Sequence, residues 1–144
     1  MKVVKKRGSG IIPKISIALI VVTIIAVIAA IVITQLFENH YFANQKFEEL
    51  GRNYYENSLY ESFITEHSGE DLGEAFSKYT SGFTVRLRQI LNYEFLEHDS
   101  NYRSFFDTES FTCDTNKSNV VFKPHAPYGK KDYDAEFNLI CSKL

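Results

Sequence analysis

Residues 15–37 read ISIALIVVTIIAVIAAIVITQLF, and none of these 23 residues carries a charge. A helix of this length reaches ~34 Å at about 1.5 Å per residue, slightly more than the hydrocarbon core of a bilayer, about 30 Å. Its many β-branched residues lower helix propensity in water, but in lipid every backbone group must be bonded within the segment. The apolar run is longer than the core of a signal peptide, and no small-residue cleavage pattern follows it. We therefore expect one uncleaved transmembrane helix, a signal anchor.

The charges on the two sides of this helix predict its orientation. Glu38, His40 and Lys46 follow the apolar run. Five basic residues and no acidic residue precede it: Lys2, Lys5, Lys6, Arg7 and Lys14. Because basic flanks stay on the cytoplasmic side, we expect the N-terminus in the cytoplasm and the C-terminal domain outside the cell membrane. The chain then has three parts: a cytoplasmic basic stub (1–14), a transmembrane helix (15–37) and an extracytoplasmic domain (38–144).

One face of the apolar helix carries mostly small residues at steps of four: Ala18, Val22, Ala26, Ala30 and Thr34. Small side chains at this spacing let a second helix approach closely. Two interpretations stay open. The helix packs against a partner, in a homo-oligomer or a membrane complex, or Ala is simply common in membrane helices. The lipid bilayer itself is the partner that the sequence predicts directly.

The remaining residues predict a packed domain rather than a disordered tail. Residues 38–144 contain 11 basic and 18 acidic side chains, a net charge of −7, with all nine Tyr and eleven of the twelve Phe. Such a supply of aromatic residues is untypical of disorder. Apolar residues then recur at three- and four-residue steps or their multiples: Phe37, Tyr41, Phe47, Leu50 and Tyr54. The apolar helix is therefore expected to continue as one amphipathic rod to about residue 67.

Beyond residue 67 the pattern predicts short helices and then strands. Residues 68–71 resemble a capping box that opens a short helix. Residues 83–96 fit a helix or a strand, and their length favours a helix. Three runs have strand character, at 111–113, 120–122 and 133–141, and the short turns between them predict a meander. The expected fold is α+β: the transmembrane helix continues into a long amphipathic helix, packed on short helices and a small C-terminal antiparallel β-meander.

The two cysteines, Cys113 and Cys141, both fall in the part predicted to lie outside. Each belongs to the apolar face of a predicted strand, so the two can meet in a small sheet. An oxidising compartment favours a disulfide, and the chain-entropy model assigns such a loop roughly 3–4 kcal/mol. Two buried free thiols are the alternative. Two cysteines are too few for a zinc or iron–sulfur site.

No residue pattern predicts catalysis, a metal or a cofactor. The four histidines are scattered, and no nucleophile or phosphate-binding motif occurs. Asp132, Asp134 and Glu136 share one strand face, which is more often a solvated surface than a calcium site. Arg86 and Arg88 are too few for a nucleic-acid surface, and a domain at net −7 repels phosphate. A small-molecule ligand is not specified by the sequence.

These features predict a membrane-tethered, non-enzymatic domain that acts through protein contacts. The architecture is also similar to that of type IV pilins and their minor relatives. Residues 1–10 look like a basic leader ending in Gly, residues 11–37 like the apolar half of the pilin helix, and Cys113 and Cys141 like its late disulfide. Ile15 stands where most pilins carry Glu, five residues after that Gly, a departure shared by some minor pilins. The resemblance implies a minor pilin-like subunit.

A different class of function is an extracytoplasmic ligand sensor or an accessory subunit of a membrane complex. The cytoplasmic stub of 14 residues is too short to hold a signalling domain. A sensor of this kind therefore needs a membrane partner that carries the signal.

Overall fold

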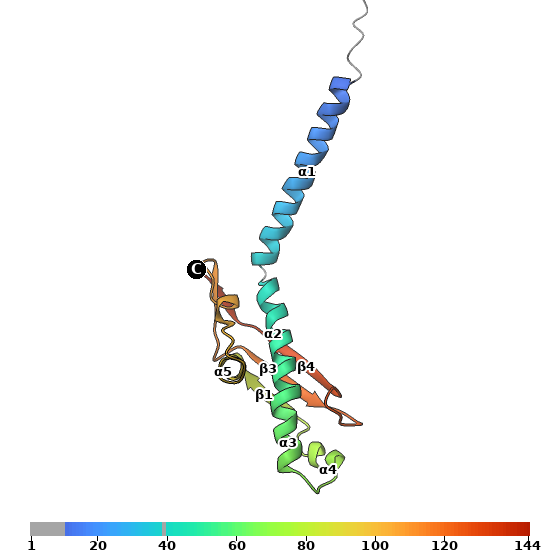
Figure 1. Ribbon diagram of the computed structural model, residues 1–144, viewed down its shortest axis with the longest axis vertical. Helices are drawn as coiled ribbons and strands as arrows, with labels where there is room; N and C mark the ends of the chain where they lie inside the picture. The colour runs from blue at the N-terminus through green and yellow to red at the C-terminus, as the bar shows by residue number, and fades with distance from the viewer. Residues whose placement is uncertain (1–10, 39) are drawn as a thin grey trace, which may run out of the picture. The chain divides into compact units, whose positions relative to one another are not determined.

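The described part of the first of two compact units is a single helix. The computed structural model describes residues 11–38 and 40–144, and the units meet at residue 39. In the first unit, α1 (Ile11–Glu38) is an unbroken helix (Figure 1). Its side chains at 14–35 are exposed all the way round, and both threonine hydroxyls donate to carbonyls four residues earlier (2.8 Å). The helix is long and apolar enough to cross a membrane.

The second unit opens with a helix in three consecutive parts: α2 (Tyr41–Tyr54), the π-turn η1 (Tyr55–Leu59) and α3 (Tyr60–Glu66). Its end agrees with the end predicted near residue 67. Its start does not agree with the prediction of a helix continuous with the apolar segment. The helix α1 ends at Glu38, and His40 has a left-handed backbone (φ 54°), which interrupts a right-handed helix. The prediction of one rod from the apolar segment to residue 67 is therefore wrong. Asn39 lies outside the described residues.

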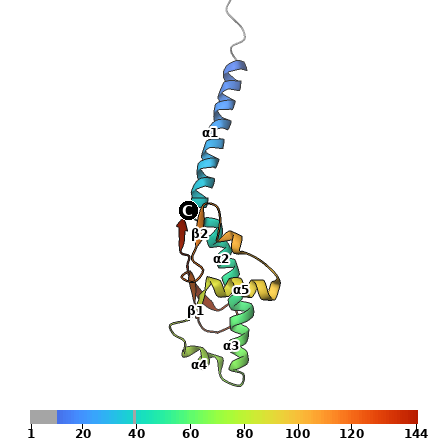
Figure 2. The same cartoon turned by 90° about the vertical axis from the view of Figure 1, so that its left-hand side faces the viewer.

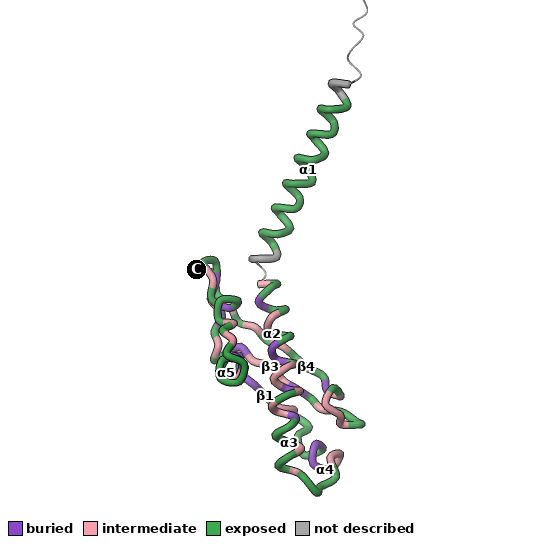
Figure 3. The backbone as a smooth tube through the Cα atoms, in the orientation of Figure 1, coloured by how far each residue is buried: buried purple, intermediate pink, exposed green. Residues whose placement is uncertain are grey.

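The π-turn keeps the apolar face of this helix directed at the core. Along α2 the buried side chains Ala43, Phe47 and Leu50 follow steps of four and three. The next large buried side chains, Tyr55 and Tyr60, each lie five positions further on. The Tyr60 N–H donates to the Tyr55 carbonyl, the i→i+5 bond of a π-turn. The wider turn rotates the helix so that both tyrosines stay buried, and Figure 3 shows this face as recurring purple segments.

A three-stranded antiparallel sheet packs against this helix. The strand order is β1 (Phe83–Arg86), β3 (Asn119–Pro124), β4 (Tyr133–Asn138). The register aligns apolar residues on one face of all three strands. On that face the Phe122 ring lies 4.8 Å from the Tyr55 ring, and the Phe137 ring lies 5.1 Å from the Phe47 ring. The core of the domain thus lies between this helix and the sheet.

Residues 83–96, which fit either a helix or a strand, form both. The strand β1 ends at Arg86, and α5 (Leu87–His98) begins at the next residue. The N–H groups of the first two α5 residues donate to the carbonyls of Ser118 and Thr115 (2.9 Å each). These bonds satisfy donors that a helix start leaves open, so no loop is needed between strand and helix. Figures 1 and 2 together show α5 crossing the long helix of this unit.

Two short helices complete the helical part, α4 (Leu72–Ser77) and the 3₁₀ turn η2 (Arg103–Phe105). The cap of α4 is Asp71, whose Oδ1 accepts the Glu74 N–H (2.9 Å). The predicted capping box placed Ser68 there. Gly69 has φ 91°, which turns the backbone between Ser68 and the helix, so the cap falls to the later residue.

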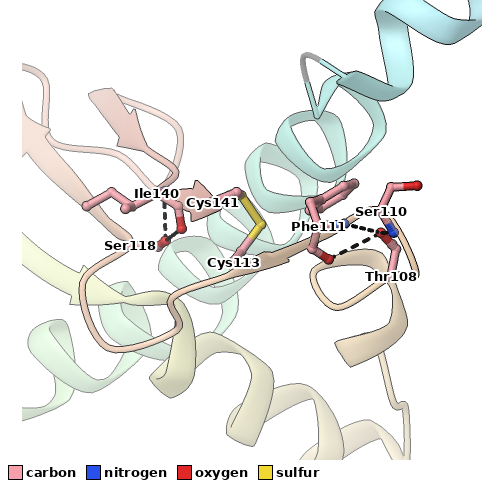
Figure 4. The surroundings of a disulfide bond; sticks show 7 residues. All are labelled: Thr108, Ser110, Phe111, Cys113, Ser118, Ile140 and Cys141. Carbon is pink, nitrogen blue, oxygen red and sulfur yellow. Dashed lines mark hydrogen bonds between the residues drawn. A yellow bond between two sulfur atoms is a disulfide. The ribbon is translucent and has the colours of Figure 1, made fainter. Parts of the chain in front are cut away.

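The two remaining strands, β2 (Phe111–Cys113) and β5 (Cys141–Lys143), form a separate antiparallel pair. The predicted meander is therefore right only for β3 and β4, and the run at 133–141 breaks after β4. Figure 4 shows the cause, since the Ser118 hydroxyl accepts the Ile140 N–H (3.0 Å). The Ile140 carbonyl accepts the Asp114 N–H (2.8 Å). With both backbone groups of Ile140 bonded outside the ladder, the chain leaves the first sheet.

Candidate functional site

The predicted disulfide between Cys113 and Cys141 is present in the structure (Figure 4). The two residues face each other across the β2–β5 pair, with Cα atoms 3.8 Å apart. They are 28 positions apart in the chain, and closing such a loop contributes roughly 3–4 kcal/mol in the chain-entropy model. Each strand has three residues, too few to form a stable pair alone. The disulfide therefore holds this small sheet together.

Beside the disulfide lies a pocket of about 450 Å³, lined by residues of α5, of η2 and the two positions after it, of β2 and of the turn before β3. Three of its lining side chains are apolar and buried: Leu91, Phe106 and Cys113. The others are polar: Arg88, Asn92, Arg103, Asp107, Thr112, Thr115 and Asn116. The pocket thus combines an apolar lining with charged, amide and hydroxyl groups.

Two arginines line this pocket from different elements, each with a fixed backbone. The Arg88 N–H, in the first turn of α5, donates to the Thr115 carbonyl (2.9 Å). The Arg103 carbonyl, in η2, accepts the N–H groups of Phe106 (2.9 Å) and Asp107 (3.0 Å). Within the described residues, neither guanidinium group has an ion-pair or hydrogen-bond partner. Two unpaired cations therefore lie at one pocket.

Two aspartates lie in this region, and only one of them lines the pocket. The Asp114 carboxylate accepts the N–H groups of Asn116 and Lys117 (2.9 Å each). These backbone hydrogen bonds lower the pKa of Asp114, and its carboxylate is engaged within the turn. Asp107 lines the pocket, and its carboxylate forms no hydrogen bond or ion pair within residues 11–38 and 40–144. Asp107 is thus the anionic group available to a ligand there.

The residues that the sequence predicts for topology and helix contact belong to the first unit, and none of them is among the residues that line this pocket. Four of the basic residues are outside the described residues: Lys2, Lys5, Lys6 and Arg7. Lys14 is exposed near the start of α1. The residues of the small face are all exposed along α1: Ala18, Ala26, Ala30 and Thr34. A partner for that face stays a prediction.

The three carboxylates of the last long strand do not gather around a common point. Asp132 accepts the Gly129 N–H (2.8 Å), and Glu136 pairs with Lys123 (3.3 Å). In the described part of the chain, no group of three His, Cys, Asp or Glu side chains is placed to hold a metal ion. These residues belong to a turn and a strand surface.

Two further polar groups are buried in the core, away from the pocket. Tyr55 is fully buried, and its hydroxyl has no partner among the described residues. Burial raises the pKa of Tyr55 well above that of an ordinary tyrosine. Glu94 is also buried, and its carboxylate accepts one hydrogen bond from Asn53 (2.8 Å). This bond joins α2 to α5, which is a structural role.

The pocket does not follow from any sequence motif, because its residues come from four elements between 88 and 116. The sequence contains only a weak indication of this pocket. Arg88 has no acidic residue three or four positions away, so no helical ion pair neutralises it. Comparison with known protein families, curated proteins and solved structures gave no match to the chain. Function is therefore inferred from the residues of this chain alone.

Proposed function

We propose that the chain is a single-pass membrane protein whose α+β domain lies outside the cytoplasm and acts through contacts with other proteins, without catalysis. The observation that carries this proposal is α1. From Lys14 to Gln35 it is long and apolar enough to span a bilayer, and all its side chains are exposed. A helix whose apolar side chains are all exposed is unfavourable in water, so another apolar phase or protein must contact it. Lipid matches both its length and its uniformly apolar surface.

The disulfide and the flanking charges support the outside location. Cys113 and Cys141 are bonded, and disulfides persist mainly in oxidising compartments. The basic residues before α1 favour a cytoplasmic N-terminus, which puts the domain on the opposite side. The charge pattern and the disulfide are independent of each other and favour the same orientation.

The side-chain contacts of the domain support a role without catalysis. Both cysteines are in the disulfide, so neither is a free nucleophile. Within the described residues, His67 contacts Glu70 (3.2 Å), and His125 contacts a backbone carbonyl (3.1 Å). No histidine ring there is bonded to a hydroxyl group, the usual arrangement of a nucleophile and its base.

Membrane-impermeant maleimide labelling of intact cells tests this topology. Cysteine is introduced at Ser81, an exposed turn residue, in one variant, and at Ser9 in the matched variant. We expect the S81C protein to be labelled in intact cells and the S9C protein only after permeabilisation. The opposite pattern would overturn the orientation, and release of the chain by alkaline carbonate would overturn the anchor.

A minor pilin-like subunit is the second candidate. The observation that favours it is the packing of the 41–66 helix against an antiparallel sheet, together with a disulfide at the last strand. This arrangement agrees with the resemblance stated from the sequence, and fold analogy alone does not decide function. Intact-mass measurement of the membrane-extracted protein tests it. Loss of residues 1–10 would support the pilin-like role, and their retention would rule it out.

A further inference from the structure

We propose that the pocket beside the disulfide binds a free α-amino acid. The guanidinium groups of Arg88 and Arg103 receive its carboxylate, and the Asp107 carboxylate receives its ammonium group. This goes beyond the proposed function, which gives the domain protein contacts and no small ligand.

The pocket has the size of a small-molecule site. Its volume, about 450 Å³, falls within the range of about 300–1,000 Å³ usual for such sites. Leu91 and Phe106 are 5% and 1% exposed, so they form a packed wall, whereas Arg88, Arg103 and Asp107 are exposed and open to a ligand. The disulfide at Cys113 holds one wall in place before a ligand arrives, which reduces the ordering cost of binding.

The two arginines supply the carboxylate-binding half of the site. A single exposed arginine on a surface is solvated and implies no ligand. Arg88 and Arg103 differ because they line one pocket from two elements, and neither guanidinium is paired within the described residues. A guanidinium group binds a carboxylate through two parallel hydrogen bonds. An anion bound between the two would be attracted by both charges.

Asp107 decides which class of anion fits. Its backbone is held in the wall, because its N–H donates to the Arg103 carbonyl (3.0 Å) and it bridges to Thr112. A carboxylate at this place repels phosphate or sulfate but accepts hydrogen bonds from a cationic donor. A ligand that carries a carboxylate and an ammonium group complements both signs of charge. An α-amino acid carries the two on one carbon atom.

The charge of the whole domain favours the same class. Residues 38–144 have 11 basic and 18 acidic side chains, a net charge of −7. Such a field opposes the approach of ligands with several negative charges. A zwitterion has no net charge, so the field leaves its approach almost unchanged.

Isothermal titration calorimetry of the full chain in lipid nanodiscs tests the proposal. The probes are the twenty common amino acids, and for each that binds, its deaminated carboxylic acid and its N-acetyl derivative. Inorganic phosphate is the comparison anion. We expect saturable binding of at least one amino acid and at least tenfold weaker binding of both its derivatives, because each derivative lacks the cationic ammonium group that donates to Asp107.

Three substitutions and a matched control locate the site. We expect Arg88→Gln and Arg103→Gln each to weaken amino-acid binding at least tenfold. Asp107→Asn should weaken it similarly, yet leave the affinity for the deaminated acid unchanged or higher. Arg86→Gln removes an exposed arginine that does not line the pocket, and it should change nothing. All four side chains are exposed, so the thermal midpoint should stay constant and show that each variant is folded.

Three results would overturn the proposal. The first is no binding of any amino acid up to millimolar concentration. The second is equal binding of the N-acetyl derivative, which would indicate the C-terminus of a peptide instead. The third is tighter binding of phosphate, which would indicate a simple anion site. Since the titration does not depend on which side of the membrane the domain faces, its failure is distinguishable from failure of the topology test.

Discussion

Tyr55 carries a hydroxyl group into the core, where no described residue receives it. Its ring lies among those of Phe122 (4.8 Å) and Tyr133 (4.2 Å). An unsatisfied buried hydroxyl costs about 1–3 kcal/mol, whereas the ring contacts are kept by phenylalanine. We therefore expect Tyr55→Phe to raise the free energy of unfolding by about 1 kcal/mol. Thermal or urea denaturation of the full chain measures this.

Tyr133→Phe is the matched control, because the Tyr133 hydroxyl donates to Glu56 (2.9 Å). Removing that donor should lower the free energy of unfolding by about 1 kcal/mol. Changes of opposite sign in the free energy of unfolding of the two variants would distinguish a hydroxyl without a hydrogen-bond partner from a hydroxyl that has one. A loss of stability in both variants would mean that Tyr55 has a bound water as its partner.

Burial of tyrosine side chains also makes the stability of the domain depend on pH in the alkaline range. Desolvation raises the pKa values of Tyr54, Tyr55 and Tyr133 above the usual value. In the unfolded chain these tyrosines lose protons near pH 10, while the folded domain still holds them. The contribution of these tyrosines to stability is therefore constant below about pH 10 and falls as pH rises further, because the unfolded state binds fewer protons. Denaturation midpoints and tyrosinate absorbance over this range test the prediction. A constant midpoint would contradict it.

At the scale of elements, Gly51 allows α2 to pack closely on β4. A Cβ atom there would lie 2.6 Å from the ring of Phe137. Leucine is a better helix former than glycine by about 1 kcal/mol, so propensity alone favours Gly51→Leu. Overpacking costs about 1–3 kcal/mol, and the Phe137 ring is held by Phe47 (5.1 Å), so it has little room to move. We expect a net loss of stability in denaturation experiments. Glu48→Leu, at an exposed position of the same helix, should have almost no effect.

The elements also show which features a sequence pattern can predict. The apolar helix, the β3–β4 pair and the disulfide follow from charge-free length, alternation and cysteine position. The break at His40 and the departure of the chain at Ile140 do not. Each depends on one backbone conformation or one side-chain hydrogen bond, which leaves no periodic trace. The pocket could not be predicted from the sequence either, because its lining residues come from separate segments between residues 88 and 116.

For the whole molecule, the division into two units predicts that the second folds without the first. The hydrophobic core of the described residues runs from Ala43 to Tyr133, and the side chains of α1 at 14–35 are all exposed. A domain of this size can bury enough apolar surface, and the disulfide adds roughly 3–4 kcal/mol. We therefore expect a fragment of residues 40–144 to be soluble, with the denaturation midpoint of the full chain. Reduction of the disulfide should lower both midpoints alike. An aggregated fragment, or one without a cooperative transition, would show that the domain depends on contacts with α1.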